Sequence, residues 1–194
     1  MVKANTNSKQ GFTIIEVVLV LAIAGLIFLM VFVALPALQR SQRDTQRRND
    51  LSRVDTSLVQ YQTNNQGTGN GNLPTSGTYV GSSAFDDSTC KTSTACLFVR
   101  NYMNSGTSDN IYTNTFQDPD GTYYGMKIMS QTDIPADPGW SYQNNSGAGS
   151  AMNHIIYIFP GAKCNGEYVV KDTERHFAIA YRLEGAGSYC IDDQ

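Results

Sequence analysis

The hydrophobic positions of the chain form an unbroken apolar run followed by regular apolar stripes. Every residue from 17 to 35 is apolar or glycine, and no charged residue lies between Glu16 and Arg40. A helix of about 20 apolar residues spans the hydrocarbon core of a bilayer. The run therefore predicts one membrane-spanning helix, and no second run of this kind follows.

A helical stripe continues from this run. Neither glycine nor proline interrupts residues 40–64, in which Leu51, Val54, Leu58 and Tyr61 recur at spacings of three and four. Such spacing places the four side chains on one helix face. A continuous helix over residues 12–64 is about 80 Å long, which exceeds any bilayer. Its second half is predicted to pack on a globular head, with a downstream sheet as the natural partner.

The remainder of the chain carries loop, helix and strand patterns. The sequence NQGTGNGN at residues 65–72 ends the long helix, and loops dominate to about residue 94. Apolar residues at helical spacing predict a short helix over residues 95–103. Four segments rich in β-branched and aromatic residues predict an antiparallel sheet of about four strands. They are GTYYGMKIM at 121–129, HIIYIF at 154–159, HFAIAYRL at 176–183 and GSYCI at 187–191.

Charge and composition narrow the function. The 194 residues favour a single domain, and the net charge of −3 excludes a generally basic protein that coats nucleic acid. After residue 60 acidic side chains outnumber basic ones, which opposes DNA binding in bulk but leaves a local patch open. The sequence contains no G-x-S-x-G, H-E-x-x-H or P-loop motif. We therefore expect a protein that is not an enzyme.

The start of the apolar run has an unusual boundary. Residues 1–11, MVKANTNSKQG, are hydrophilic and carry Lys3 and Lys9 without an acid. An ordinary secretory signal peptide is disfavoured, because the run is too long and its only A-x-A sequence lies inside it. Glu16 stands at the edge of the run, where a carboxylate is costly in lipid and suggests a functional site. The alternative is that Glu16 only marks the aqueous boundary of an anchor.

The basic leader, Gly11-Phe12, Glu16 and the uninterrupted apolar helix together resemble the processing site of type IV prepilins and type II secretion pseudopilins. The resemblance implies that a prepilin peptidase cleaves between Gly11 and Phe12 and that Phe12 is then N-methylated. It also implies that Glu16 meets the Phe12 ammonium of a neighbouring subunit and sets the axial register of a filament. Residues four apart share a helix face, and inside an apolar bundle a charge pair is tolerated where a single charge is not.

The resemblance extends to the architecture. It implies an α+β pilin fold, in which a long N-terminal helix packs on a C-terminal antiparallel sheet. We expect a cleaved leader at residues 1–11, a transmembrane and filament-core helix at 12–39, the amphipathic half of the same helix at 40–64 and a globular pilin head at 65–194. Gly25 and Pro36 interrupt the first half, where partial melting on assembly and a simple bent anchor both remain open.

Basic residues flank the apolar run on both sides, and their count conflicts with this topology. More of them follow the run than precede it, so the positive-inside rule places the C-terminal part in the cytoplasm. The cysteines and the prepilin-like site favour the opposite orientation. Together with nearby aspartates, the arginines form either a solvated face with local ion pairs or a contact with anionic lipid headgroups. The arginines are Arg40, Arg43, Arg47, Arg48 and Arg53, and the aspartates are Asp44, Asp50 and Asp55.

Four cysteines, Cys90, Cys96, Cys164 and Cys190, all lie in the predicted head. An even count outside the cytoplasm predicts two disulfides, for which three connectivities exist. We favour Cys90 with Cys96 and Cys164 with Cys190, and the second pair resembles the C-terminal disulfide loop of many type IV pilins. A zinc site is the alternative, although the cysteine spacing does not match zinc motifs.

A carboxylate-rich turn is the weak metal candidate. Asp118-Pro119-Asp120-Gly121 has the composition of a β-turn, and it also offers the hard oxygen ligands that calcium requires. Asp133 and Asp137 are further possible ligands. We expect the turn and no cofactor, with calcium at Asp118 and Asp120 as the alternative.

The resemblance implies a structural subunit that polymerises through its apolar helix into a type IV pilus-like surface filament. Such filaments serve adhesion, twitching motility or DNA uptake. The alternatives are a pseudopilin of a type II secretion system and a monomeric membrane-anchored binding domain. The implied partners are further copies of the chain, other pilins, the prepilin peptidase and an assembly platform with its ATPase. The precursor is expected in the cytoplasmic membrane as a single-pass protein, and the mature subunit in an extracellular filament.

Overall fold

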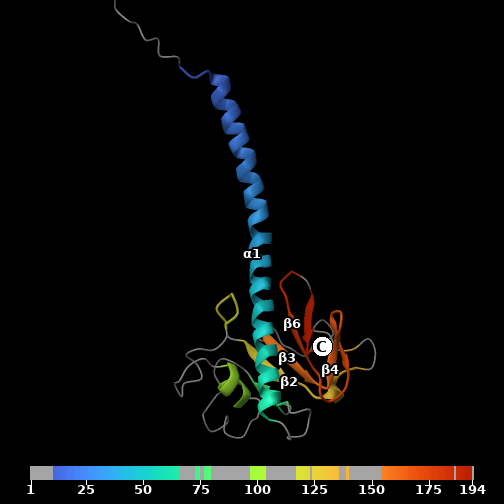
Figure 1. The fold of residues 1–194 in the computed structure, drawn as a ribbon. Helices are drawn as coiled ribbons and strands as arrows, with labels where there is room; N and C mark the ends of the chain where they lie inside the picture. The colour runs from blue at the N-terminus through green and yellow to red at the C-terminus, as the bar shows by residue number, and fades with distance from the viewer. Residues whose placement is uncertain are drawn as a thin grey trace, which may run out of the picture. The chain divides into compact units, whose positions relative to one another are not determined.

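The structure of the chain is a computed structural model that describes residues 11–65, 73–74, 77–79, 97–103, 117–122, 124–135, 139, 154–185 and 187–193. The chain divides into two compact units, Met1–Ser41 and Gln42–Gln194. Figure 1 shows the elements coloured along the chain. The first unit holds the apolar half of one long helix, and the second holds the polar half of that helix together with all the strands.

The helix α1 covers Ile14–Asn64, as the hydrophobic pattern predicts to within two residues. It begins at Ile14 because Thr13 and Glu16 cap it. The Glu16 carboxylate accepts from the Thr13 backbone N–H at 2.9 Å, and the Thr13 hydroxyl accepts from the Glu16 N–H at 3.4 Å. This reciprocal pair is a capping box, which satisfies two backbone donors at the helix start. Pro36 lies inside the helix without ending it.

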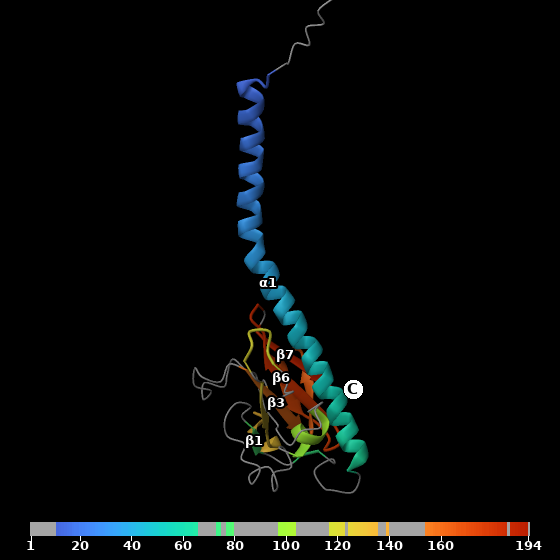
Figure 2. The ribbon, with the colours of Figure 1, turned by 90° about the vertical axis from the view of Figure 1, so that its left-hand side faces the viewer.

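The second unit contains a five-stranded sheet in the order β1-β2-β3-β6-β7. Figure 2 shows β7, β6, β3 and β1 following one another across it. The four predicted strand segments are β2, β3, β6 and β7, so the α+β architecture with a mainly antiparallel sheet is confirmed. The strands are β1 Gly77–Tyr79, β2 Gly125–Ile128, β3 Ile155–Pro160, β6 Phe177–Arg182 and β7 Ser188–Asp192.

Two features of the sheet differ from the prediction. The short strand β1 adds a fifth strand at one edge, and β2 pairs with β3 in parallel, while the other pairs are antiparallel. A parallel pair needs a long connection that returns the chain to the same end of the sheet. Residues 129–154 supply that connection, and strand composition alone does not reveal the direction in which a strand will pair.

A separate hairpin lies between β3 and β6 in the sequence. It consists of β4 Ala162–Asn165 and β5 Tyr168–Lys171, which pair antiparallel from Ala162 and Lys171 to Asn165 and Tyr168. Gly166 in its turn has φ +64°, a left-handed conformation that glycine adopts without steric cost. The hairpin was not predicted, since its strands are short and only partly apolar.

One face of the sheet packs on the polar half of α1. Leu51, Val54 and Leu58 have exposed fractions of 0–1%, and Tyr61 packs partly buried beside them, which confirms the predicted stripe. The sheet contributes alternate residues to this core, because successive side chains of a strand point to opposite faces. They are Met126, Ile128, Ile156, Ile158, Phe177, Ile179 and Tyr181.

The opposite face of the sheet forms a second core. Here Tyr157 and Phe159 of β3 and the alanines of β6 pack with Ala162 and Val169 of the β4–β5 hairpin. Both faces of β3 are therefore covered, and all six of its residues are buried. This accounts for the continuous apolar sequence of β3, which lacks the alternation expected of a strand with one face in water.

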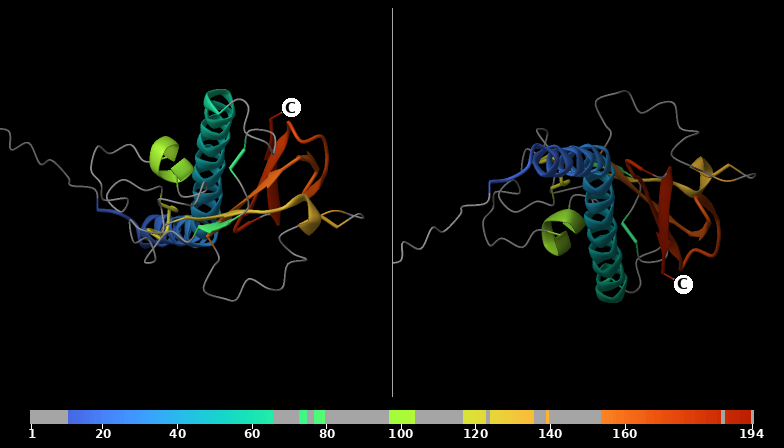
Figure 3. Two further views of the ribbon diagram at one scale, coloured as in Figure 1. Left: turned by 90° about the horizontal axis from the view of Figure 1, so that it is seen from below. Right: turned by 90° about the horizontal axis from the view of Figure 1, so that it is seen from above.

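A short helical segment was predicted over residues 95–103, and its described part is α-helical at Leu97 and Phe98 and continues as the π-helix η2, Val99–Met103. The rings of Tyr61, Phe98 and Tyr102 meet with centroids 5.4–5.9 Å apart. Figure 3 shows η2 beside the C-terminal end of α1. The aromatic cluster thus joins η2 to the last turns of the long helix.

Candidate functional site

A buried ion pair joins α1 to the turn that precedes β2. Arg47 is 3% exposed and Asp118 2% exposed. Two parallel hydrogen bonds connect them, from Nε to Oδ2 and from Nη2 to Oδ1, each 2.7 Å long. A planar guanidinium fits a carboxylate in this two-pronged way, which adds both strength and direction to the contact.

The turn at residues 118–121 is formed as predicted. The Gly121 N–H donates to the Asp118 carbonyl at 2.8 Å, and Gly121 has φ +89°. The Asp118 carboxylate also accepts from the Asp120 N–H at 3.1 Å and from the Tyr181 hydroxyl at 3.0 Å. Together with the two bonds from Arg47, four donors therefore occupy the Asp118 carboxylate.

A second layer of ionic contacts surrounds this pair. Asp44 lies one helical turn before Arg47, and its carboxylate accepts from the backbone N–H groups of Glu184 and Gly185, both at 2.9 Å. The Glu184 side chain pairs with Arg43 at 2.7 Å and with Arg47 at 2.9 Å. Arg43 and Arg47 thus bind carboxylates of the head at sequence separations of 141 and 71 positions, and Arg47 is buried. The predicted solvated face with local ion pairs is therefore wrong for Arg47, because folding packs this part of α1 against the head.

Arg47, Asp118, Tyr124 and Tyr181 form one ionic centre, and each has a shifted pKa. Burial by itself would raise the pKa of Asp118, but the hydrogen bonds from Arg47, the Asp120 N–H and Tyr181, together with the charge of Arg47, outweigh burial and lower that pKa to about 2. The same contact raises the pKa of Arg47 above its usual range. Burial raises the pKa of Tyr181 and Tyr124, and the negative charge of Asp118 raises both further. The centre is therefore a charged Arg47 and Asp118 with two neutral tyrosines.

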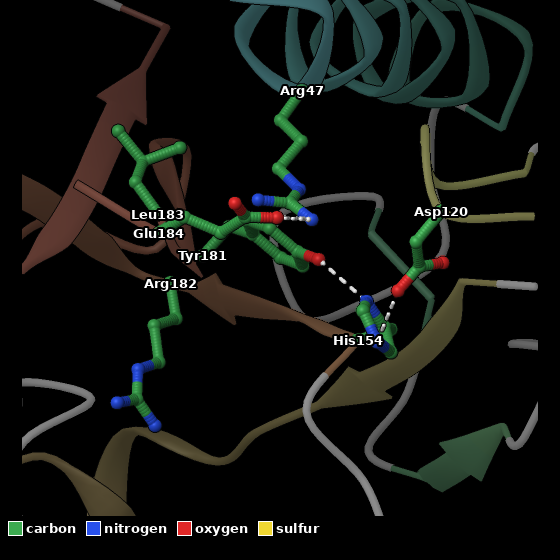
Figure 4. A pocket seen from close by; sticks show the side chains of 7 residues that line it. All are labelled: Arg47, Asp120, His154, Tyr181, Arg182, Leu183 and Glu184. Carbon is green, nitrogen blue, oxygen red and sulfur yellow. Dashed lines mark hydrogen bonds and ion pairs between the residues drawn. The ribbon is translucent and has the colours of Figure 1, made fainter. Parts of the chain in front are cut away.

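A pocket lined by Asp120 and His154 opens beside the buried ion pair. With Asp118, these two residues form the one possible metal-binding group in the described part of the chain. Figure 4 shows His154 between Asp120 and Tyr181. The calcium candidates Asp118 and Asp120 thus lie together, but the four donors on Asp118 leave it poorly placed to bind calcium through carboxylate oxygens. Of the other possible ligands, Asp133 caps the 3₁₀ helix η3, Gln131–Asp133, and Asp137 lies outside the described residues.

The N-terminal segment presents the predicted processing residues openly. Gly11 and Phe12 precede the helix and Phe12 is 89% exposed. Apart from its chain neighbours, no described residue has an atom within 4 Å of a Cβ position built on Gly11. Glu16 lies in the first turn of α1 and forms the capping box with Thr13. The peptide bond between Gly11 and Phe12 is therefore outside the helix, where an extended peptide can enter a protease.

The apolar half of α1 has no protein partner among the described residues of its own unit, 11–41. Large apolar side chains from Ile14 to Leu38 are 42–85% exposed. By length and apolar composition, α1 is the one helix in the described part of the chain that could cross a membrane. Exposed apolar surface on this scale requires lipid or another protein to cover it.

Comparison with known proteins decides the nature of this segment. Residues 6–32 match the family model of the prokaryotic N-terminal methylation motif. The chain carries the class III signal peptide of type IV pilins and pseudopilins. The searches of curated proteins and of solved structures found no match.

The pilin-type signal accounts for the first unit. It implies processing by a prepilin peptidase, and with the apolar helix it fits a membrane-anchored precursor. The matched residues include Gly11, Phe12 and Glu16, which the structure places at the start of α1. Cleavage, methylation and the assembly role of Glu16 remain predictions.

The head carries one of the two disulfides predicted for this pilin-like chain. Cys164 and Cys190 are bonded, with their Cα atoms 5.8 Å apart, and they tie the β4–β5 hairpin to β7. The pairing of Cys90 with Cys96 lies outside the described residues. A covalent link between two elements that are not hydrogen-bonded neighbours in one sheet stabilises the C-terminal part of this pilin-like head.

The sequence did not indicate Arg47, His154 and Tyr181 as parts of one centre. Arg47 is one of five arginines with no feature that sets it apart, and His154 belongs to no recognisable motif. The turn motif at residues 118–121 gives a weak indication of such a centre, because a carboxylate that becomes buried requires a cationic partner. The partner of that carboxylate lies 71 positions away, so the motif alone cannot name it.

Proposed function

We propose that the chain is a pilin subunit that polymerises through the apolar half of α1 into a type IV pilus-like surface filament. The observations that carry this proposal are the methylation motif at residues 6–32 and the apolar half of α1, whose large apolar side chains are exposed in the described part of its unit. In a membrane, lipid covers the helix. In a filament, the helices of neighbouring copies replace the lipid and exclude water from the same surface.

Glu16 directs assembly in this proposal. Cleavage before Phe12 creates an ammonium group at the start of the helix, and a charged group inside an apolar bundle is stable when an opposite charge lies beside it. Glu16 is the first acidic residue after the cleavage point, and the charge-free apolar run follows it directly. The Glu16 carboxylate of one subunit meets the Phe12 ammonium of its neighbour, which selects one axial register.

The filament has the head on its outside and serves adhesion, twitching motility or DNA uptake. The partners of the subunit are further copies of the chain, other pilins, the peptidase and the assembly platform with its ATPase. The subunit itself needs no catalytic site, because the ATPase supplies the work of extraction from the membrane.

The test combines electron microscopy of cell-surface filaments with mass spectrometry of the subunit that they contain. We expect a mature chain that starts at an N-methylated Phe12. Glu16→Leu should be processed like the wild type but should give few or no filaments, while Glu16→Asp, which keeps the charge, should retain part of the yield. An intact residue 1 on exported protein, or a wild-type yield from Glu16→Leu, would contradict the proposal. If wild-type cells show no surface filaments and cells that lack the chain lose protein secretion, the chain is a type II secretion pseudopilin.

A further inference from the structure

The pocket beside the buried ion pair contains a histidine whose two ring nitrogens face different surroundings. Nδ1 of His154 lies 3.3 Å from the Tyr181 hydroxyl oxygen and 3.4 Å from Oδ2 of Asp118. Nε2 lies 3.1 Å from Oδ2 of Asp120. Figure 4 shows the imidazole ring placed between the Tyr181 hydroxyl and the Asp120 carboxylate.

The hydrogen bonds of the centre determine which nitrogen carries a proton. Tyr181 has one hydroxyl proton, and it is directed to the Asp118 carboxylate at 3.0 Å. A hydrogen bond to an ionised carboxylate is stronger than one to a neutral imidazole. Both groups that face Nδ1 therefore act as acceptors, so Nδ1 is the N–H donor and the neutral ring has its lone pair on Nε2.

Nε2 then points a lone pair at the Asp120 carboxylate, which is also an acceptor. Two acceptors at 3.1 Å repel each other unless a cation lies between them, either a proton or a metal ion. Two ligands that each bind zinc at about 2.0–2.1 Å with a tetrahedral angle are about 3.3 Å apart. The observed separation fits two ligands of one metal ion.

The surrounding charges favour a cation at this point. Arg43 and Arg47 neutralise Glu184, and Arg47 also binds Asp118 and Asp44. Oδ1 of Asp120 accepts from the N–H and hydroxyl of Thr122, while Oδ2 has His154 as its partner. Figure 4 shows the guanidinium of Arg182 directed away from His154.

We propose that His154 and Asp120 bind a divalent metal ion of the zinc class, with Asp118 and Tyr181 orienting the histidine from behind. A carboxylate that fixes the non-ligating nitrogen of a metal-bound histidine is a common arrangement around zinc. The imidazole ligand favours zinc over calcium, which prefers oxygen ligands throughout. The side chains of His154 and Asp120 are 25% and 37% exposed, so water can complete the coordination.

Zinc replaces any proton held between Nε2 and Oδ2, and that proton passes to solvent. With two protein ligands and water in the remaining positions, the affinity should be moderate and not that of a closed structural site. A bound zinc ion would link Asp120, in the turn at residues 118–121, to His154, which directly precedes β3.

The test is a calorimetric titration of the full chain in detergent with zinc chloride, and separately with calcium chloride. We expect one zinc per chain and no calcium binding at the same concentration. His154→Gln and Asp120→Asn should each weaken zinc binding at least tenfold. Asp120→Asn keeps the Oδ1 acceptor for Thr122, so the turn should remain folded, and the unfolding midpoint of each variant checks this.

The control uses the one other histidine of the sequence. His176 also faces an aspartate, with Nδ1 2.9 Å from Oδ2 of Asp172, so His176→Gln removes an equivalent pair from a different place. Zinc binding should be unchanged in this variant. Absence of zinc binding in the wild type, equal binding in His154→Gln, or loss of binding in His176→Gln would each overturn the proposal.

Discussion

The Arg47 guanidinium is the residue-level connection between the long helix and the head. It binds Asp118, Asp44 and Glu184 from its buried position. Two charges taken out of water lose hydration, and their mutual attraction only roughly compensates for that loss. The pair therefore contributes little net stability, but the loss of either partner leaves the other as an unpaired buried charge.

Replacement of Arg47 by alanine should lower the free energy of unfolding by about 3–5 kcal/mol, because Asp118 would remain buried without its cation. The matched control is Arg43→Ala. Arg43 pairs with Glu184 near the surface, where such pairs contribute about 0–1 kcal/mol. Urea unfolding of the full chain in detergent measures both variants. Equal losses in the two variants would contradict the special role of the buried pair.

Acid should destabilise the head through Asp118. Its pKa is about 2 in the fold and near 3.8 when unfolded, so above pH 4 the fold is about 2 kcal/mol more stable than it would be with Asp118 protonated. That contribution is lost as the pH falls from about 4 through 2, because protons then bind the unfolded chain first. Urea midpoints at several pH values should show this decline in the wild type and a weaker decline in Arg47→Ala. If the urea midpoints of both proteins decline equally with falling pH, carboxylates other than Asp118 cause the loss of stability in acid.

Asp55 should behave in the opposite way. Its Oδ1 is buried and has no hydrogen-bond partner among the residues that the structure describes, and burial, followed by Asp193 and Asp192, raises its pKa. An acid with a raised pKa in the fold destabilises the fold at high pH, and the loss disappears as the pH falls through that pKa. Asp55→Asn should therefore stabilise the head at pH 7.5 by on the order of 1 kcal/mol, with no gain near pH 3.

The control for Asp55 is Glu167→Gln in the exposed β4–β5 turn, which should change stability by less than about 0.5 kcal/mol. Unfolding in urea at both pH values distinguishes the two variants. A gain in Asp55→Asn that persists unchanged at pH 3 would mean that removal of its charge is not the cause.

At the level of elements, the polar half of α1 binds the sheet through one apolar face. Leu58 is 0% exposed and Val59, the next residue, is 43% exposed. Leu58→Ala should reduce the free energy of unfolding by about 2–5 kcal/mol, because it removes buried methyl groups and leaves a cavity. Val59→Ala should change it by less than about 0.5 kcal/mol. A similar loss in both variants, measured by thermal unfolding, would contradict the predicted orientation of the helix.

The strands illustrate what local pattern can and cannot predict. β3 and β6 were recognisable because six and five consecutive buried residues, rich in β-branched and aromatic types, form a strong local signal. β4 and β5 have four residues each with mixed exposure, so their local signal is weak. The parallel direction of β2 against β3 depends on the path of a long connection, which no local pattern records.

At the level of the whole molecule, the arginines after the apolar run raise the question of orientation. In the folded chain Arg43 and Arg47 bind carboxylates, and Arg48 lies 5.0 Å from the centre of the Tyr189 ring. These arginines make contacts within the unit Gln42–Gln194, so their position after the apolar run does not require a cytoplasmic location. The Cys164–Cys190 disulfide also favours an oxidising compartment.

We therefore predict that the head is exported. Alkaline phosphatase fused after Gln194 should be active, because that enzyme forms its own disulfides only outside the cytoplasm. A fusion after Gly11, before the apolar run, is the control and should be inactive. The reverse pattern of activity would show that the positive-inside count decides the orientation, and it would contradict a pilin-like topology.

The features that depend on neighbouring residues could be predicted from the amino-acid sequence. Gly11, Phe12 and Glu16 lie within six positions, and the apolar run follows directly. The prepilin-like signal is therefore a short contiguous motif that can be recognised in the sequence. The same holds for α1, because its periodicity repeats every few residues. In contrast, tertiary packing buries Arg47 against Asp118 and places His154 opposite Asp120. These contacts join residues 34 to 71 positions apart, and a one-dimensional pattern does not encode which distant charges will share one low-dielectric site.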